Sequence, residues 1–258
     1  MANSRPVAFI TGAGSGIGRA VALELSSTHA VIAADRDAAG LERTVSSIGA
    51  SVMGFVADVS DLGSLEAAVA GGTAAYGAVS ATVACAGIEV RGTALDVDVD
   101  EWNRCIGVNL TGVMLTAKCT LPSLLETGGS FTAISSDAGI SGSQGYAPYV
   151  ASKHGVVGLV RAMAMDFAPQ GVRSNVLCPG FVQTPMADRL FAQSSESEVE
   201  FYRKTVPLGR FAKASEVAGV VRHFIESPYS NGVVYSLDGG STTGYFMSPD
   251  LLQTAPSA

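Results

Sequence analysis

The chain is poor in cysteine, and the cysteines it has form no recognisable motif. They lie far apart, with no Cys-x-x-Cys spacing and no histidine pair nearby, so the sequence supports neither a zinc site nor a redox motif. We therefore expect no metal, and we expect these residues to be small interior side chains. They are Cys85, Cys105, Cys119 and Cys178.

Basic residues and long apolar runs are also scarce. Lysine and arginine number 16 against 23 aspartate and glutamate residues, for a formal charge of -7. This balance disfavours non-specific attraction to nucleic acid or anionic membranes. The apolar run nearest the start, Val7 to Ile10, is too short for a signal peptide or a spanning helix. We therefore predict a cytoplasmic protein without nucleic-acid or membrane partners.

What the chain does contain is a regular alternation of short apolar runs and longer helical patterns. With 258 residues, 47% of them hydrophobic, and no Pro/Ser-rich linker, it predicts one domain with a substantial core. Strands that are apolar throughout and separated by helices indicate a doubly wound parallel α/β sheet of about seven strands, with helices on both faces. Ligands should bind at the carboxyl ends of the strands. The predicted strands are 7–11, 30–35, 51–58, 81–87, 130–136, 174–180 and 232–240.

A glycine-rich turn, TGAGSGIG, follows the first predicted strand and precedes a helical pattern. Glycines at such a turn let a pyrophosphate approach the backbone N–H groups and the positive end of the helix dipole. Ile17 breaks the common GxGxxG spacing, and the fit is TGxxxGxG, with Gly12, Gly16 and Gly18. The turn lacks the Gly-Lys-Ser/Thr ending of an ATP-binding P-loop, which argues against an ATPase or kinase.

Asp35 ends the second predicted strand, where a carboxylate can accept hydrogen bonds from the ribose hydroxyls of NAD and repel the 2′-phosphate of NADP. The turn offers no cation for that phosphate, so NAD is favoured. Arg36 partly offsets this preference, because a guanidinium beside the ribose attracts a phosphate. Asp58 has two alternatives: it caps the next helix, or it hydrogen-bonds the adenine.

Tyr149 and Lys153 lie four residues apart, which places both on one helix face about 6 Å apart along the axis. A second phenol, Tyr146, would share that face if the helix extended back to it. Pro148 favours a helix that begins at or near itself, which leaves Tyr146 in the preceding loop and Tyr149 in the first turn.

Taken in order, the motifs are TGAGSGIG, Asp35, CAG (85–87), NLTG (109–112), the serine pair 135–136, YVASK (149–153) and PGFVQT (179–184). Over residues 6–243 the chain resembles the short-chain dehydrogenase/reductase family. The resemblance implies a single Rossmann-type catalytic domain spanning 1–258, a nicotinamide cofactor, and a homotetramer or homodimer assembled through helices near 101–124 and 149–168. One departure is Ala84-Cys85, where the family usually has an asparagine pair, so any side-chain role there is lost.

The resemblance also implies roles for residues at matching positions. Tyr149 matches the catalytic acid/base, Lys153 its partner and Ser136, rather than Ser135, the catalytic serine. Asn109 matches the asparagine that supports a proton-relay water. The cofactor-binding positions are Gly12, Ser15, Gly16, Ile17, Gly18, Asp35, Asp58, Val59, Ala86, Gly87, Asn109, Tyr149, Lys153, Gly180, Val182 and Thr184.

Hydride exchange between a secondary alcohol and NAD needs a group that takes the hydroxyl proton. A phenol titrates near pH ~10, so ionising it at neutral pH requires a shift of about three units. A lysine ammonium and a positive nicotinamide supply a field of the right sign, and Ser136 can hold the substrate oxygen. We expect Ser136, Gln144, Tyr146, Tyr149 and Phe181 to bind a medium-sized, partly apolar alicyclic or aromatic-derived substrate, with Asp137 and Ala138 also lining its pocket.

Two segments and two further functions stay open. Residues 187–206 are either a solvated surface helix or a lid over the substrate. The tail 245–258 either packs on a neighbouring subunit or frays. Besides an NAD-dependent dehydrogenase, the chain fits an NADP-dependent ketone reductase, or a non-catalytic NAD-binding interaction protein of the same fold.

Overall fold

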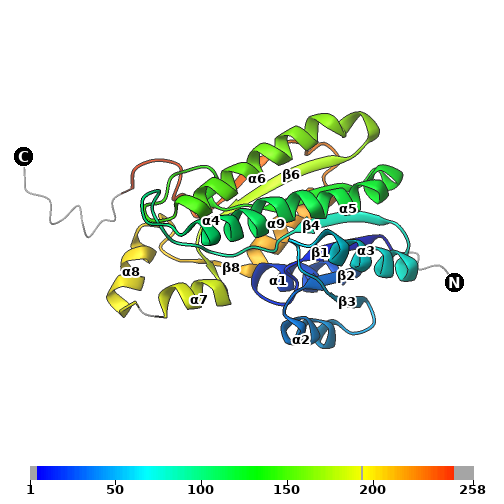
Figure 1. Ribbon diagram of the computed structural model, residues 1–258, viewed down its shortest axis with the longest axis horizontal. Coiled ribbons are helices and arrows are strands. Elements are labelled where there is room, and N and C mark those ends of the chain that lie inside the picture. Colours follow the sequence, from blue (N-terminus) through cyan, green and yellow to red (C-terminus); the bar gives the residue numbers. More distant parts are fainter. Residues whose placement is uncertain (1–4, 193, 247–258) are drawn as a thin grey trace, which may run out of the picture.

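A computed structural model describes residues 5–192 and 194–246 and shows a parallel sheet with helices on both faces (Figure 1). The strand order is β3-β2-β1-β4-β5-β6-β9, and every neighbouring pair is parallel. The predicted doubly wound fold is therefore confirmed. The strands are β1 (Val7–Thr11), β2 (Ala30–Asp35), β3 (Val52–Val56), β4 (Val79–Ala84), β5 (Ser130–Ile134), β6 (Arg173–Pro179) and β9 (Val234–Leu237).

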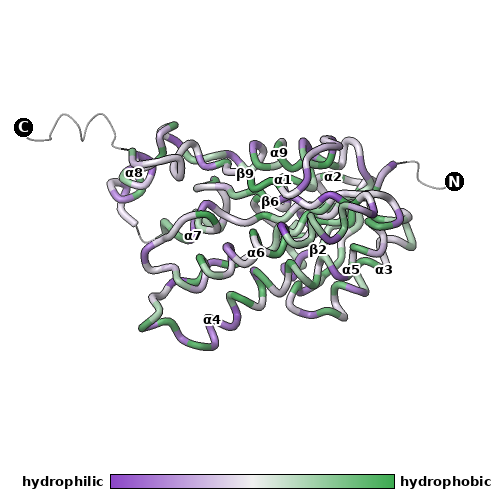
Figure 2. Tube along the Cα trace, turned by 90° about the horizontal axis from the view of Figure 1, so that it is seen from above, coloured by the Kyte–Doolittle hydropathy of each residue, from purple (hydrophilic) through white to green (hydrophobic). Residues whose placement is uncertain are grey.

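The two faces of the sheet pack into two separate hydrophobic cores. Successive side chains of a strand point to opposite faces, so Phe9 belongs to one core and Ile10 to the other. Helices α3 (Leu62–Tyr76), α5 (Gly112–Thr127) and α6 (Ala147–Asp166) line the core that contains Phe9. Helices α1 (Gly16–Leu25), α2 (Ala38–Ile48) and α9 (Ala214–Glu226) line the other. Hydrophobic and hydrophilic residues alternate along these helices, as expected for elements with one buried face (Figure 2).

The connection between α4 (Val99–Ile106) and α5 is a π-helical turn, Gly107–Thr111, which makes the two helices almost continuous. The predicted strands 51–58 and 81–87 end earlier than expected, at Val56 and Ala84. Their last residues instead form loops at the carboxyl edge of the sheet. This edge is therefore richer in irregular backbone than the sequence suggested.

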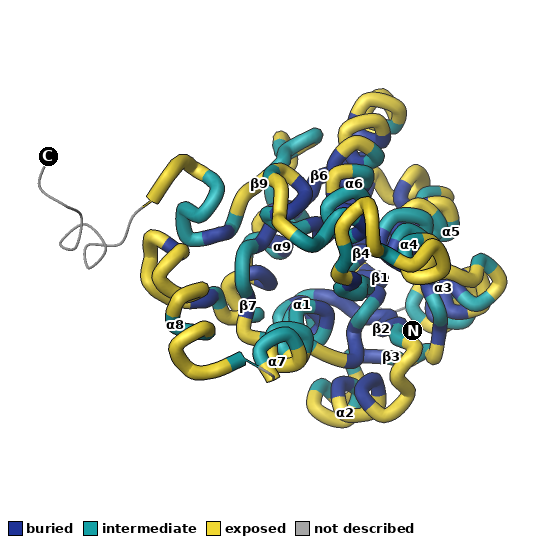
Figure 3. The backbone as a smooth tube through the Cα atoms, turned by 60° about the vertical axis from the view of Figure 1, so that its left-hand side comes forward, coloured by how far each residue is buried: buried dark blue, intermediate teal, exposed yellow. Residues whose placement is uncertain are grey.

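The segment after β6 leaves the sheet and forms α7 (Pro185–Phe191) and α8 (Glu196–Lys204) (Figure 1). A small parallel pair, β7 (Val182–Gln183) with β8 (Ala212–Lys213), holds its two ends together. Figure 3 shows that most of α8 is exposed, and no residue of α7 or α8 whose burial is described counts as buried. The predicted tail, 245–258, lies outside the described residues beyond position 246.

The expectations from composition concerned interior cysteines, metal sites and membrane-spanning helices. Cys105 and Cys178 are buried, while Cys85 and Cys119 are partly exposed, so the interior prediction holds for two of the four. Within 5–192 and 194–246, no three His, Cys, Asp or Glu side chains gather in a way that could hold a metal ion. None of the helices in these ranges combines the length and apolarity needed to cross a membrane.

Candidate active site

The glycine-rich turn joins β1 to α1 at the carboxyl edge of the sheet. Gly12 and Gly16 have positive φ angles of 68° and 52°, a backbone region that other residues rarely adopt. A Cβ at Gly12 would lie 2.8 Å from the backbone nitrogen of Ala86, and a Cβ at Gly18 would overlap the carbonyl of Gly12. Ser15 is the N-cap of α1 and makes no side-chain capping bond. The first N–H groups of α1 are thus left available to an anion.

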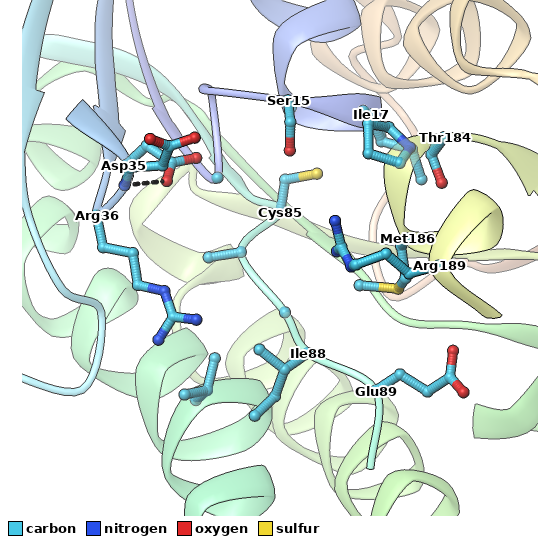
Figure 4. Close-up of a pocket in the computed structure, with 18 of the residues that line it drawn as sticks. Ser15, Ile17, Asp35, Arg36, Cys85, Ile88, Glu89, Thr184, Met186 and Arg189 are labelled. Carbon is cyan, nitrogen blue, oxygen red and sulfur yellow. Dashed lines mark hydrogen bonds between the residues drawn. The ribbon is translucent and has the colours of Figure 1, made fainter. Parts of the chain in front are cut away.

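Asp35 lies beside this turn and is held by two backbone groups. One carboxylate oxygen accepts a hydrogen bond from the Gly14 N–H and the other from the Asp37 N–H, each at 2.8 Å. Figure 4 shows the carboxylate at one end of a cavity, with the Arg36 side chain beside it. Each carboxylate oxygen has a second lone pair, so the group can still accept from a ribose hydroxyl.

Asp58 does not cap the next helix, and that alternative from the sequence is wrong. Its carboxylate accepts from the N–H and hydroxyl of Ser60, at 2.9 Å and 2.6 Å, and these bonds hold the Asp58 pKa below its ordinary value. Asp61, three residues later, is the N-cap of α3 and accepts from the Gly63 N–H. Asp58 stays at the sheet edge, next to the cavity.

Lys153 and Asn109 lie under the loop that follows β4. The Lys153 side chain is buried; its Nζ donates to the Ile134 carbonyl at 3.1 Å and lies 5.6 Å from the centre of the Tyr149 ring. Burial lowers the pKa of this ammonium. The Asn109 amide accepts from the Ile88 N–H at 2.8 Å and donates to the Ile88 carbonyl at 2.9 Å. The loop backbone is therefore fixed beside the lysine.

Gly87 permits this close approach. A Cβ at position 87 would lie 3.4 Å from both the Asn109 oxygen and the Lys153 nitrogen, tighter than most such contacts. Asn109 itself belongs to the π-helical turn between α4 and α5, where its amide also donates to the Ser152 hydroxyl at 3.1 Å. Three segments that are far apart in the sequence thus meet at one asparagine.

Tyr149 lies near Lys153 and is hydrogen-bonded to Ser136. Burial raises the pKa of the Tyr149 phenol beyond its ordinary range, and a hydrogen bond with Ser136 opposes that shift. The Ser136 hydroxyl also donates to the Asp137 carboxylate at 2.7 Å. Burial raises the Asp137 pKa. The neighbouring Ser135 hydroxyl donates instead to the Lys153 carbonyl at 2.9 Å, so only the second serine of the pair faces the phenol.

The two tyrosines occupy different positions, as Pro148 predicted. Helix α6 begins at Ala147 with the proline in its first turn, which places Tyr149 in that turn and Tyr146 at the N-cap. The guanidinium of Arg91 lies over the Tyr146 ring, 5.5 Å from the ring centre. Next to it, Gly92 pairs with the chain before α6 through bonds to Gly145 and Ala147, at 2.8 Å and 2.9 Å.

A cavity of about 970 Å³ runs along this edge (Figure 4). Eleven of the predicted cofactor residues line it: Gly12, Ser15, Gly16, Ile17, Gly18, Asp35, Asp58, Val59, Ala86, Gly87 and Thr184. Five others do not: Asn109, Tyr149, Lys153, Gly180 and Val182. Several residues that line the cavity were not predicted from the sequence. They lie next to the motifs CAG and PGFVQT in the chain, and this closeness in sequence could have revealed them. They include Ile88, Glu89, Met186, Arg189 and Leu190.

Four aromatic rings gather where α7 and α8 face the cleft. Phe181 lies 5.6 Å from Phe191, 5.6 Å from Tyr202 and 5.2 Å from Phe211, measured between ring centres. A second cavity of about 460 Å³ adjoins this cluster. The predicted substrate residue Gln144 is exposed. None of the five predicted substrate residues, Ser136, Gln144, Tyr146, Tyr149 and Phe181, is among those that line these two cavities.

The model of the family described as short chain dehydrogenase matches residues 6–195. The chain belongs to the short-chain dehydrogenase/reductase family. It is an oxidoreductase of the type that acts on CH–OH groups, and a nicotinamide cofactor is expected for such an enzyme.

Two relatives cover most of this short-chain dehydrogenase. It is 37% identical to "Inactive 2-(S)-hydroxypropyl-CoM dehydrogenase 2" of Xanthobacter autotrophicus, over 81% of this chain and 93% of that protein. It is 36% identical to trans-4-hydroxycyclohexanecarboxylate dehydrogenase of Sinomonas cyclohexanicum, over 95% of each chain.

Solved structures agree with the fold. Levodione reductase superposes with a TM-score of 0.89 at 32% identity, over 95% of this chain and all of that one. An actinorhodin polyketide ketoreductase solved with NADPH gives the same TM-score at 33% identity and the same coverage.

Proposed function

We propose that this chain is an NAD-dependent oxidoreductase that interconverts a secondary alcohol and a ketone, with Tyr149 as the acid/base. The observation that carries the proposal is the meeting of Tyr149, Lys153 and Asn109 at the carboxyl edge of the sheet, next to the glycine-rich turn. The substrate we propose is medium-sized and partly apolar, alicyclic or aromatic-derived. The aromatic cluster around Phe181 and the alicyclic name of the Sinomonas relative support this class.

The residues present fit a dinucleotide. The turn has no side chain at positions 12, 16 and 18, where a pyrophosphate would approach the backbone, and the cavity extends from Asp35 to the loop at Gly87. Asp35, Asp58 and Val59 would hold the adenosine end, and Ser15 to Gly18 the pyrophosphate. Gly180, Val182 and Thr184 would hold the nicotinamide end.

When bound, the cofactor accepts or returns the hydride. Tyr149 takes the proton of the substrate hydroxyl in oxidation and gives a proton to the ketone oxygen in reduction. Lys153 places a positive charge near the phenol and favours its ionised form, against the effect of burial. Ser136 orients the substrate oxygen, and Asn109 fixes the loop beside the lysine, where it would also support a proton-relay water.

Asp35 supports NAD over NADP. Its carboxylate is fixed at the cavity end by Gly14 and Asp37, so a 2′-phosphate there would meet a negative charge that cannot turn away. Arg36 and the NADPH-containing ketoreductase keep an NADP-dependent ketone reductase as the second candidate. Comparing the dissociation constants of NAD and NADP for the same preparation separates the two.

The test of activity is direct. The protein is incubated with NAD and a panel of cyclic and acyclic secondary alcohols, and the absorbance of reduced cofactor is followed. We expect turnover with at least one alicyclic alcohol. The non-catalytic alternative, to which the inactive Xanthobacter relative lends weight, predicts NAD binding without turnover on any member of the panel.

We also propose that the chain acts as one catalytic domain in a cytoplasmic homotetramer, built through helices near 101–124 and 149–168. Light scattering of the purified protein measures its mass directly. A mass of one or two chains would contradict the tetramer.

A further inference from the structure

Four arginines line the main cavity, although the chain as a whole is acidic. Three of these arginines lie next to an acidic or aromatic side chain. Arg104 forms a two-pronged ion pair with Glu101, at 3.0 Å and 2.6 Å. Arg91 lies over the Tyr146 ring, and its Nε is 3.4 Å from Glu89. Arg36 lies beside Asp35 at the adenosine end and helps to lower the Asp58 pKa.

Arg189 is the fourth, and it differs from the others. Among the described residues, no acidic side chain lies within ion-pair distance of its guanidinium. Figure 4 shows the guanidinium directed into the cavity, toward Ser15 and Cys85, and the residue remains exposed to solvent there. A cation that points into a cavity without a partner is placed to receive an anion.

The position of α7 brings this cation opposite the glycine-rich turn. The N-cap of α7, Thr184, packs against the turn, because a Cβ at Gly16 would lie 3.3 Å from the Thr184 methyl group. Arg189 follows Thr184 by five residues, about 7.5 Å along a helix axis, within the reach of a guanidinium side chain. Ser15, Gly16 and Arg189 line the same cavity.

The turn itself offers no charged side chain to an anion. Its side chains are those of Ala13, Ser15 and Ile17, and its attraction for anions comes from backbone N–H groups and the dipole of α1. That dipole is equivalent to roughly half a positive charge, whereas a pyrophosphate carries two negative charges. One full cation on the opposite wall would supply most of the missing charge.

We propose that Arg189 binds the pyrophosphate of the cofactor from the side opposite the glycine-rich turn. The inference rests on the proposed function, since it assumes a dinucleotide in this cavity. It assigns α7 a part in cofactor binding, besides any contact with the substrate. The alternative is that Arg189 binds an anionic group of the substrate.

The test compares two ligands by calorimetry. ADP-ribose contains the pyrophosphate, and adenosine contains the same base and ribose without phosphate. We expect Arg189→Ala to weaken ADP-ribose binding by about tenfold to a hundredfold, the range for a lost charge-assisted hydrogen bond. The affinity for adenosine should stay within about twofold, because no charge pair is removed from it. Arg189→Lys should restore part of the ADP-ribose affinity, since it keeps the charge but loses the planar fork.

Arg203→Ala is the matched control. Arg203 lies on α8, in the same excursion, and pairs with Glu200 instead of facing the cavity. It should leave ADP-ribose affinity unchanged. The inference is overturned if Arg189→Ala binds ADP-ribose as the wild type does, and a raised KM for an acidic substrate would then assign the arginine to the substrate. If the wild type binds neither ADP-ribose nor NAD, the proposed function fails instead.

Discussion

The two walls of the cleft are built differently. The inner wall, formed by the glycine-rich turn, Asn109, Tyr149 and Lys153, lies at the carboxyl edge of the sheet, and Asn109 and Lys153 bond to the backbone. The outer wall, formed by α7 and α8, contains no residue described as buried, and the ion pair between Arg203 and Glu200 joins two residues of α8 to each other. Chemistry that needs fixed geometry is thus placed on buried, hydrogen-bonded groups. The wall that suits varied substrates is held mainly by aromatic contacts.

The largest effect should come from the phenol of the inner wall. Tyr149→Phe removes the proton that the reaction exchanges, so kcat should fall by about a thousandfold or more. The NAD dissociation constant should change little, because the ring is kept. The matched control is Tyr146→Phe, which should retain kcat within about tenfold, since this phenol is not expected to transfer a proton. Comparable turnover in Tyr149→Phe and wild type would refute the assignment.

The next effect tests the hydrogen bonds of the inner wall. Asn109→Ala leaves the N–H and carbonyl of Ile88 without their partner, which should cost about 3 kcal/mol in the free energy of unfolding. Urea denaturation measures this loss. Asn103→Ala, at an exposed position of α4, should change stability by less than about 0.5 kcal/mol. Equal stabilities for the two variants would show that the Asn109 bonds contribute nothing.

Packing of the glycine-rich turn gives a smaller effect. Gly18→Ala forces a Cβ against the Gly12 carbonyl, so α1 must shift, at a cost of about 2 kcal/mol and with weaker NAD binding. Gly219→Ala, in the middle of α9 with no atom near its Cβ, should instead stabilise the protein by up to about 1 kcal/mol. Thermal unfolding of both variants, with and without NAD, checks the opposite signs.

Apart from Arg189, side chains of the outer wall should act on substrate when they are substituted, and the fold should be spared. Phe191→Leu removes a ring stacked within 5.6 Å of Phe211 and should raise KM by about tenfold, the effect of about 1.4 kcal/mol of lost apolar contact. The melting temperature and the NAD affinity should hardly change. If NAD affinity in Phe191→Leu fell by a larger factor than KM rose, Phe191 would act mainly on the cofactor, and the expected difference between the two walls would be wrong.

The smallest effect concerns alkaline pH. The pKa of Tyr149 is raised in the folded chain, so its phenol stays neutral when the same phenol in the unfolded chain ionises near pH ~10. Its contribution to stability is complete below that pH and decreases as the pH rises above it. Tyr149→Phe should therefore lose less stability than the wild type between neutral and alkaline pH, measured by urea denaturation. A wild type that loses no more than the variant would contradict the raised pKa.

The sequence predicted the inner wall more fully than the outer one, for a physical reason. Glycine spacing, the strand-ending Asp35 and the Tyr149–Lys153 interval all depend on local backbone geometry, which short motifs encode. The start of α6 at Ala147 followed in the same way from Pro148. The ends of β3 and β4, observed at Val56 and Ala84, were predicted too late, because the first loop residues, Ala57 and Cys85, continue the apolar pattern of the strands.

Other features depend on contacts between distant segments, and these have no local signature. The Ile88–Asn109 bonds span 21 residues, and the ring cluster joins residues from 181 to 211. The direction of Arg189 into the cavity depends on how α7 packs against the glycine-rich turn. The cap of α3 is a different case, because Asp61 accepts from the Gly63 N–H two residues later and an aspartate at a helix start is a local signal; the sequence reasoning considered only Asp58.

The π-helical turn at Gly107–Thr111 has a consequence for how this chain can vary in length. Such a turn contains one residue more than an α-helix would need over the same path. Deleting one residue here would let a regular helix cover the same path, so the buried face of α5, with Val113 and Leu124, would stay in the core. The wide turn that presents Asn109 to Ile88 would be lost. Loops elsewhere can gain or lose residues; at this turn the residue count is fixed by the cleft, although the core would tolerate the loss.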